Sequence, residues 1–149
     1  MSNLIHDNNT TISELTKKLA TTLTERGLRL TTAESCTGGN LAVALCAEEN
    51  TAEFYDVGMV VFSDAAKERI LGVRHETIER FTAVSEQTVT EMAAKIRDIA
   101  EADIGVAISG YAGPEGGDDG TAAGTVCFGW NIRGQTETHT VLFSGECQD

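Results

Sequence analysis

Residues 32–39 of the chain read TAESCTGG, and an apolar stretch with Leu28 and Leu30 leads into them. Two glycines close this run just before a segment with helix-like spacing, which predicts that the hydroxyl of Ser35 lies at a strand-to-helix turn. The first N–H groups of a helix have no partner within the helix, and the helix dipole favours an anion beside them. The run therefore predicts a nucleophile next to an anion pocket on an enzyme-like scaffold.

Helix and strand patterns alternate outward from this turn. Thr11 and Glu14 form a capping-box pattern, which predicts a helix from residue 12 to Gly27. The other elements expected are a strand over 28–33, a helix over 38–47, a buried strand over 57–62, a short helix from 63 to about 72, a helix over 86–102, a strand over 104–108, and two strands over 125–130 and 138–143 that form a hairpin. This alternation predicts a layered α/β/α fold with a mixed sheet.

The bulk composition limits the classes of function. A length of 149 residues fits one domain, and a net charge of -12 opposes binding to nucleic acid or to an anionic membrane. The sequence has no apolar run long enough to span a membrane and no signal-peptide pattern, so we expect a cytoplasmic protein. The four cysteines lack CxxC spacing and the three histidines are scattered, which favours free thiols and neither a metal site nor a cofactor.

Ser35 needs a base to act as a nucleophile, and the chain has neither a GxSxG elbow nor an obvious Ser-His-Asp set. Lys67 is the candidate base, because burial can lower the pKa of a lysine. Both residues follow predicted strands, and ligands bind at the carboxyl ends of such strands. A plainer alternative stays open for each, since Ser35 could be a helix cap and Lys67 an exposed helix lysine. The glycine-rich loop over 109–121 indicates close backbone approach to a ligand.

Six motifs together resemble a known family. They are TAESCTGG at 32–39, SDAAK at 63–67, AVSE at 83–86, SGYAGPEGG at 109–117, GTV at 124–126 and FSG at 143–145. Their order is that of the C-terminal domain of the competence/damage-inducible CinA-like proteins, a family that includes stand-alone nicotinamide-mononucleotide deamidases. The resemblance covers about residues 10–149, and residues 1–9 are expected to form a disordered tail.

The resemblance implies a serine–lysine amidohydrolase in NAD salvage, which converts nicotinamide mononucleotide to nicotinic acid mononucleotide and ammonia without a metal. Ser35 would be the nucleophile and Lys67 its general base. Backbone N–H groups near Ser35 and in the glycine-rich loop would hold the oxyanion and the nucleotide phosphate. The positions implied to bind substrate are Thr37, Gly38, Gly39, Ser109, Gly110 and Gly113.

Several positions depart from the family pattern. Tyrosine and asparagine are usual where Phe62 and Asp64 stand, lysine is usual at Thr121, and arginine is usual at Cys147. Losing a charge-assisted contact costs about 1.5–3 kcal/mol. The alternative to an active enzyme is therefore a catalytically lapsed paralogue, kept for binding a small nucleotide or amide ligand or for protein interaction; a third possibility is a different amide substrate.

The chain ends directly after its last predicted strand, where family members continue into a helix. The pattern supplies few helices for one face of the sheet, and an α/β sheet normally has both faces covered. We therefore expect either a chain that lacks the final helix or a partner on that face, and a homodimer is the partner expected.

Overall fold

The structure, a computed structural model, describes residues 11–144 of the chain. The tail expected over residues 1–9 and the altered position Cys147 lie outside the described residues. Within the described range no helix has the length and apolar character needed to cross a membrane. The cysteines in this range, Cys36, Cys46 and Cys127, form no disulfide.

Helices and strands alternate through most of the chain, as the sequence predicted. The elements are α1 (Ile12–Arg26), β1 (Leu30–Glu34), α2 (Asn40–Cys46), η2 (Thr51–Glu53), β2 (Tyr55–Val60), α3 (Asp64–Ala66), η3 (Lys67–Leu71), α4 (His75–Phe81), α5 (Glu86–Ala100), β3 (Ile104–Gly110), β4 (Thr125–Ile132) and β5 (Gln135–Leu142). The capping box of Thr11 and Glu14 starts α1, and Ser85 caps α5 through the amide of Thr88.

The sheet has five strands in the order β2-β1-β3-β4-β5. Strand β1 runs parallel to β2 and to β3, whereas β4 is antiparallel to both β3 and β5. The sheet is therefore mixed, and β4 and β5 form the predicted hairpin. The carboxyl ends of the three parallel strands meet at one edge, where open α/β sheets bind ligands.

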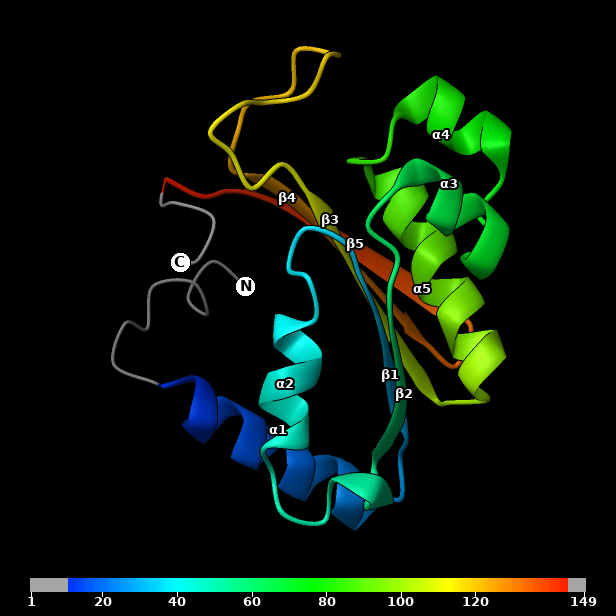
Figure 1. Cartoon of the computed structure of the whole chain (residues 1–149). Coiled ribbons are helices and arrows are strands. Elements are labelled where there is room, and N and C mark those ends of the chain that lie inside the picture. The colour runs from blue at the N-terminus through cyan, green and yellow to red at the C-terminus, as the bar shows by residue number, and fades with distance from the viewer. Residues whose placement is uncertain (1–10, 145–149) are drawn as a thin grey trace.

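Helices lie on both faces of the sheet (Figure 1). Helices α1 and α2 lie on one face, and α3, α4 and α5 lie on the other. Helix α5 contacts all five strands and places its apolar side against them, with Val89, Met92 and Ile96 fully buried. On the opposite face, Leu45 of α2 packs with Phe54 and with Tyr55 of β2. The fold is the α/β/α arrangement expected from the sequence.

The structure differs from the sequence prediction in several places. Strand β5 begins at Gln135, three residues before the predicted start, and the 3-10 turn η2 was not predicted. Helix α4 was missed, since its N-cap residue Arg74 makes no capping bond through its side chain and therefore gives no start pattern. Strands β1 and β2 are displaced by about two residues from the predicted ranges, because apolar side chains continue beyond each strand into the adjoining turn. None of these differences moves the sheet edge that carries Ser35.

Candidate active site

Ser35 lies at the turn that leaves strand β1, where the sequence predicted it. Its amide donates a hydrogen bond of 3.0 Å to the carbonyl of Ile108, which fixes the turn against the end of β3. Only 5% of Ser35 is exposed. The N-cap of α2 is Gly39 and not Ser35, so the plainer alternative of a helix cap is wrong.

Lys67 lies beside Ser35 in the structure, although it follows it by 32 positions in the sequence. It stands where α3 passes into the π-helical turn η3, a rare geometry that recurs at functional sites. Lys67 is 1% exposed, so the alternative of an exposed helix lysine is also wrong. Its Nζ donates to Oγ of Ser35 at 3.0 Å and to the carbonyl of Phe62 at 3.0 Å. The structure thus joins the predicted nucleophile to the predicted base.

Burial changes the chemistry of this lysine. Desolvation lowers the pKa of Lys67 below its ordinary value, while electrostatic interactions with Asp64 and then with Cys36 act in the opposite direction. The hydrogen-bond acceptors of its amine are a hydroxyl and a carbonyl rather than a carboxylate. A neutral amine is a base, whereas an ammonium is not, so burial prepares Lys67 to accept a proton.

The N-terminus of α2 holds a carboxylate of the chain itself. Glu34 is 1% exposed and accepts hydrogen bonds of 3.0 Å from the amides of Leu41 and Ala42. The hydroxyl of Thr37 donates to the same carboxylate at 2.6 Å. The sequence interpretation of a free anion pocket at this helix is therefore corrected, because Glu34 already supplies the anion that the helix dipole favours.

The glycines predicted to bind substrate shape the turns on either side of Ser35. Gly38 and Gly39 have φ angles of 58° and 100°, and Gly113 has a φ of 91°. Side chains rarely adopt such angles, so glycine is needed at these points of the backbone. Gly110 ends β3 and packs against the backbone of Thr125, where a Cβ atom would come within 2.7 Å of the carbonyl oxygen. The close approach at Gly110 is therefore made by strand β4, and contact of these glycines with substrate stays a prediction.

Ser109 and Thr121 hold neighbouring segments in place. The hydroxyl of Ser109 donates to the carbonyl of Ala83 at 2.8 Å and ties the turn before α5 to the sheet edge. Thr121 accepts a bond from the amide of Gly117 through its carbonyl, and its own amide donates to Asp119 at 2.9 Å. A direct contact of either residue with substrate stays a prediction.

Phe62 contacts the Ser35–Lys67 pair through its backbone carbonyl rather than through its side chain. Its carbonyl accepts from both the Lys67 amine and, at 3.3 Å, the Ser35 hydroxyl. The ring itself is 72% exposed. The loss of a phenol at this position therefore leaves the bonds within the Ser35–Lys67 pair intact. Asp64, the other altered position described by the structure, begins α3 three residues before Lys67.

Sequence reasoning missed two features of the site edge. Thr82 has φ 69° and ψ 172°, a strained backbone for a β-branched residue, and such strain clusters at active sites. Its carbonyl is held by the hydroxyls of Ser85 and Thr88. Glu34 was also missed, although a glutamate inside an apolar strand directly before Ser35 is a visible pattern.

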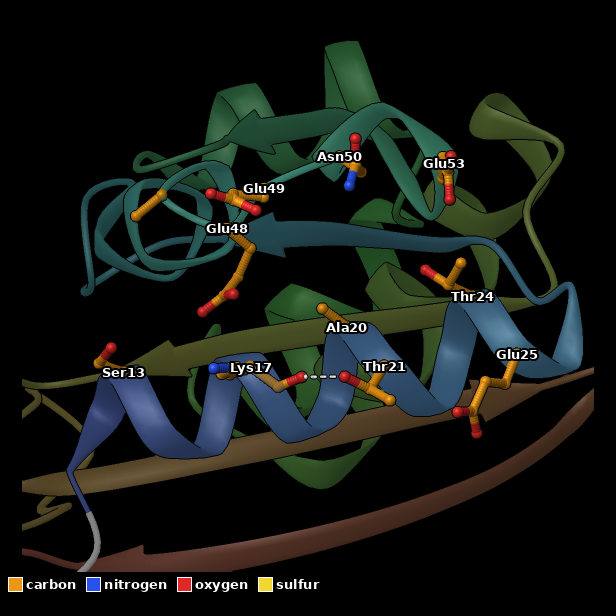
Figure 2. Close-up of a pocket in the computed structure, with 11 residues that line it drawn as sticks. Ser13, Lys17, Ala20, Thr21, Thr24, Glu25, Glu48, Glu49, Asn50 and Glu53 are labelled. Carbon is orange, nitrogen blue, oxygen red and sulfur yellow. Dashed lines mark hydrogen bonds between the residues drawn. The ribbon is translucent and has the colours of Figure 1, made fainter.

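A groove in the described residues lies away from the Ser35–Lys67 pair. It measures about 570 Å³ and runs between α1 and the segment that follows α2 (Figure 2). Glu25, Glu48, Glu49 and Glu53 line it together with Lys17. None of the residues predicted for catalysis or substrate binding lines this groove, so it is separate from the Ser35–Lys67 pair. Within residues 11–144 no cluster of His, Cys, Asp or Glu could hold a metal ion.

The family model for the CinA C-terminal domain matches residues 12–149. The chain belongs to the CinA C-terminal domain family. It is 54% identical over 138 residues to Protein YdeJ of Escherichia coli K12, an alignment that covers 93% of this chain and 80% of that protein. It is 40% identical over 136 residues to the nicotinamide-nucleotide amidohydrolase PncC of the same organism, covering 91% of this chain and 82% of PncC.

Solved structures of the CinA family have the same fold. A competence or damage-inducible protein from Enterobacter asburiae is 84% identical with a TM-score of 0.92, and the match covers 93% of this chain and 87% of that one. A CinA superfamily protein from Enterobacter cloacae is 79% identical with a TM-score of 0.93, covering 100% of this chain and 88% of that one. The family assignment and the layered α/β fold expected from the motifs are thereby confirmed.

Proposed function

We propose that this CinA-family chain is a serine–lysine amidohydrolase that acts on the carboxamide of a nicotinamide compound. The observation that carries the proposal is the 3.0 Å hydrogen bond between Nζ of Lys67 and Oγ of Ser35. Both side chains are buried, and the lysine has a lowered pKa. The name of the PncC relatives supports the substrate class. A role in NAD salvage follows from that substrate class.

Ser35 and Lys67 supply the nucleophile and the base for the acylation half of the reaction. The neutral amine of Lys67 takes the proton from Oγ of Ser35 while Oγ forms a bond to the carboxamide carbon. The C–N bond then breaks, and the proton held by Lys67 passes to the departing nitrogen, which leaves as ammonia. The carbonyl of Phe62 orients the amine throughout, because it accepts an N–H of Lys67 in either protonation state.

Water completes the reaction. It attacks the acyl ester on Ser35 and gives a proton to Lys67, which returns it to Oγ as the ester bond breaks. The balance is one amide and one water converted to a carboxylate and an ammonium ion. We assign the oxyanion to backbone N–H groups of the turn after Ser35 and of the glycine-rich loop, as the family resemblance implies.

A catalytically lapsed member that binds a ligand is the second candidate. The observation in its favour is the altered surroundings of the pair, where Phe62 presents an exposed ring and Asp64 a negative charge. A lapsed protein would bind a carboxamide without releasing ammonia. The homodimer expected from the sequence also stays a prediction, which sedimentation of the purified protein checks.

Ammonia release distinguishes the two candidates. Purified protein is incubated with nicotinamide mononucleotide, nicotinamide riboside and nicotinamide, beside the variants Ser35→Ala and Ser13→Ala. Ser13 is an exposed serine of α1 and serves as the matched control. We expect release by the parent and by Ser13→Ala, and none by Ser35→Ala. Absence of release by the folded parent with every amide contradicts the proposal, as does equal release by Ser35→Ala.

A further inference from the structure

We propose that Thr82 is a positioning residue whose hydroxyl holds the glycine-rich loop at the edge of the sheet that carries Ser35 and Lys67. The bonds proposed are donation to the carboxylate of Asp119 and acceptance from the phenol of Tyr111. Both partners belong to the segment between β3 and β4, which projects beyond the sheet edge (Figure 1). The effect on substrate binding rests on the proposed amidohydrolase, whereas the attachment of the loop is a property of the free protein.

Thr82 occupies the turn between α4 and α5 in an unfavourable backbone conformation. Its φ of 69° and ψ of 172° are rarely adopted by a β-branched residue. The amide of Thr82 donates to the carbonyl of Ile78 at 2.9 Å, and its carbonyl accepts from the hydroxyls of Ser85 and Thr88. A glycine would make the same backbone bonds without the strain. The side chain of Thr82 is therefore the part that these bonds do not explain.

The hydroxyl of Thr82 is buried without a hydrogen bond. Within residues 11–144 its Oγ1 is the one fully buried side-chain nitrogen or oxygen atom that lacks a partner. Folded proteins rarely keep such an atom, because burial removes its bonds to water. A hydroxyl has one donor and two acceptor positions, so it can join two groups at once. Two groups on the glycine-rich loop lie next to it.

Packing places Tyr111 beside Thr82. Ser109 and Tyr111 are two positions apart at the end of β3, so their side chains lie on the same side of the extended chain. The hydroxyl of Ser109 donates at 2.8 Å to the carbonyl of Ala83, the residue that follows Thr82. Tyr111 packs against the buried cluster that includes Val84. The start of the loop thus lies along the turn that carries Thr82.

The loop also brings a carboxylate to this point. A Cβ atom on Gly117 would come within 2.6 Å of both Cε2 of Tyr111 and Oδ1 of Asp119, so the ring and the carboxylate lie together. The amide of Thr121 donates to the same Oδ1 at 2.9 Å. The Thr82 hydroxyl opposes the rise that burial causes in the pKa of Tyr111, and it adds to the effect of Thr121 in lowering the pKa of Asp119. A small movement of the loop therefore completes both bonds.

A bond from Thr82 to the loop acts on the site through the end of β3. The carbonyl of Ile108 accepts the amide of Ser35 at 3.0 Å, and Tyr111 follows three residues later. Gly113, a position predicted to bind substrate, lies in the segment that the bond would hold. Release of the loop should therefore weaken substrate binding more than it slows the chemical step.

Amide hydrogen exchange of the free protein, measured by mass spectrometry, tests the proposal. Thr82→Val keeps the shape of the side chain and removes the hydroxyl, whereas Thr82→Ser keeps the hydroxyl. We expect the loop amides to exchange at least about threefold faster in Thr82→Val and near the parent rate in Thr82→Ser. Thr22→Val, which removes an exposed hydroxyl of α1, is the control and should leave exchange unchanged.

A variant that lacks both partners separates the proposed bonds from a general loosening of the fold. Tyr111→Phe combined with Asp119→Ala should speed exchange of the loop as Thr82→Val does. Adding Thr82→Val to that variant should then change the rate by less than about 1.5-fold, because the bonds are already lost. Independent, multiplying effects would overturn the proposal. Unchanged loop exchange in Thr82→Val would also overturn it, as would an equal rise in the loop and in α5.

The kinetic consequence is tested apart from the exchange. In the ammonia assay Thr82→Val should raise KM at least about threefold and change kcat less. A fall in kcat with KM unchanged would contradict the positioning role. If the parent protein releases no ammonia from any amide, the amidohydrolase proposal fails alone, and the exchange rates still decide whether Thr82 holds the loop.

Discussion

The amine of Lys67 lies 3.0 Å from the hydroxyl of Ser35, although 32 positions separate the two residues in the sequence. A lysine buried for structural reasons is normally paired with a carboxylate, because an isolated buried charge is costly. Lys67 instead donates to a hydroxyl and a carbonyl. These partners suit a neutral amine, and a neutral amine next to a serine hydroxyl is the arrangement that nucleophilic catalysis requires.

Replacing Lys67 with methionine should separate activity from stability. The variant loses the base and should hydrolyse carboxamides at least about a hundredfold more slowly. Because burial lowers the pKa of Lys67, the charged amine destabilises the fold. This cost is fully present below the lowered pKa and is lost as pH rises through 10.5, the ordinary value. Urea unfolding at pH 7 should therefore show a variant no less stable than the parent. Lys18→Met, at an exposed position of α1, is the control and should keep full activity.

The pH dependence of hydrolysis should follow the Lys67 amine. The rate should rise with pH as the amine loses its proton, with a midpoint below 10.5, the ordinary value for lysine. Asp64 raises the pKa of Lys67, so Asp64→Asn should move this midpoint to lower pH. Steady-state rates of the parent and of Asp64→Asn, measured from about pH 6 to about pH 10, check this prediction. A midpoint that moves upward in Asp64→Asn, or does not move, contradicts the assignment of Lys67 as base.

Glu34 should matter for stability and for the turn that holds Ser35. Glu34→Ala removes an acceptor shared by two backbone amides and a hydroxyl, and should lower the free energy of unfolding by about 3 kcal/mol. Glu34→Gln keeps one carbonyl oxygen and should recover part of that loss. Glu49→Ala, an exposed position, should change stability by less than about 0.5 kcal/mol. Urea unfolding monitored by Trp130 fluorescence measures all three, and equal stability of Glu34→Ala and the parent would refute the role.

Helix α5 carries one buried and one exposed isoleucine, and comparing their alanine variants tests the packing of the core. Ile96 is fully buried and Ile99 is 47% exposed on the same helix. Ile96→Ala should lower the free energy of unfolding by about 2–5 kcal/mol, because it leaves a cavity against the sheet. Ile99→Ala should cost less than about 1 kcal/mol, since most of that side chain already meets water. Similar losses in the two variants would contradict the placement of α5 on the sheet.

Local patterns predicted most of the fold. Helices α1 and α5 carry visible caps at Thr11 and Ser85, and β4 and β5 carry strand-like runs joined by a short turn. Helix α4 carries no such cap, so its start gave no pattern. Strand ends were misplaced because apolar residues continue past them into turns, where tertiary packing decides the boundary.

The site was predictable in part. Topology places Ser35 and Lys67 at the same edge of the sheet. Lys67 begins a π-helical turn there, and no local sequence pattern predicts that turn. The prediction of a free anion pocket at the N-terminus of α2 was wrong, because the carboxylate of Glu34 accepts hydrogen bonds from amides in the first turn of that helix. Thr82 was missed because its strain is set by the hydroxyls of Ser85 and Thr88.

The measurement that tests the central claim most directly is capture of an acyl group on Ser35. The protein is mixed with a carboxamide substrate, quenched in acid at early times, digested and analysed by mass spectrometry. We predict that the peptide containing Ser35 gains the mass of the acyl group, and that its formation matches the first release of ammonia. Ammonia release with an unmodified Ser35 peptide, or at the parent rate in Ser35→Ala, would contradict the claim.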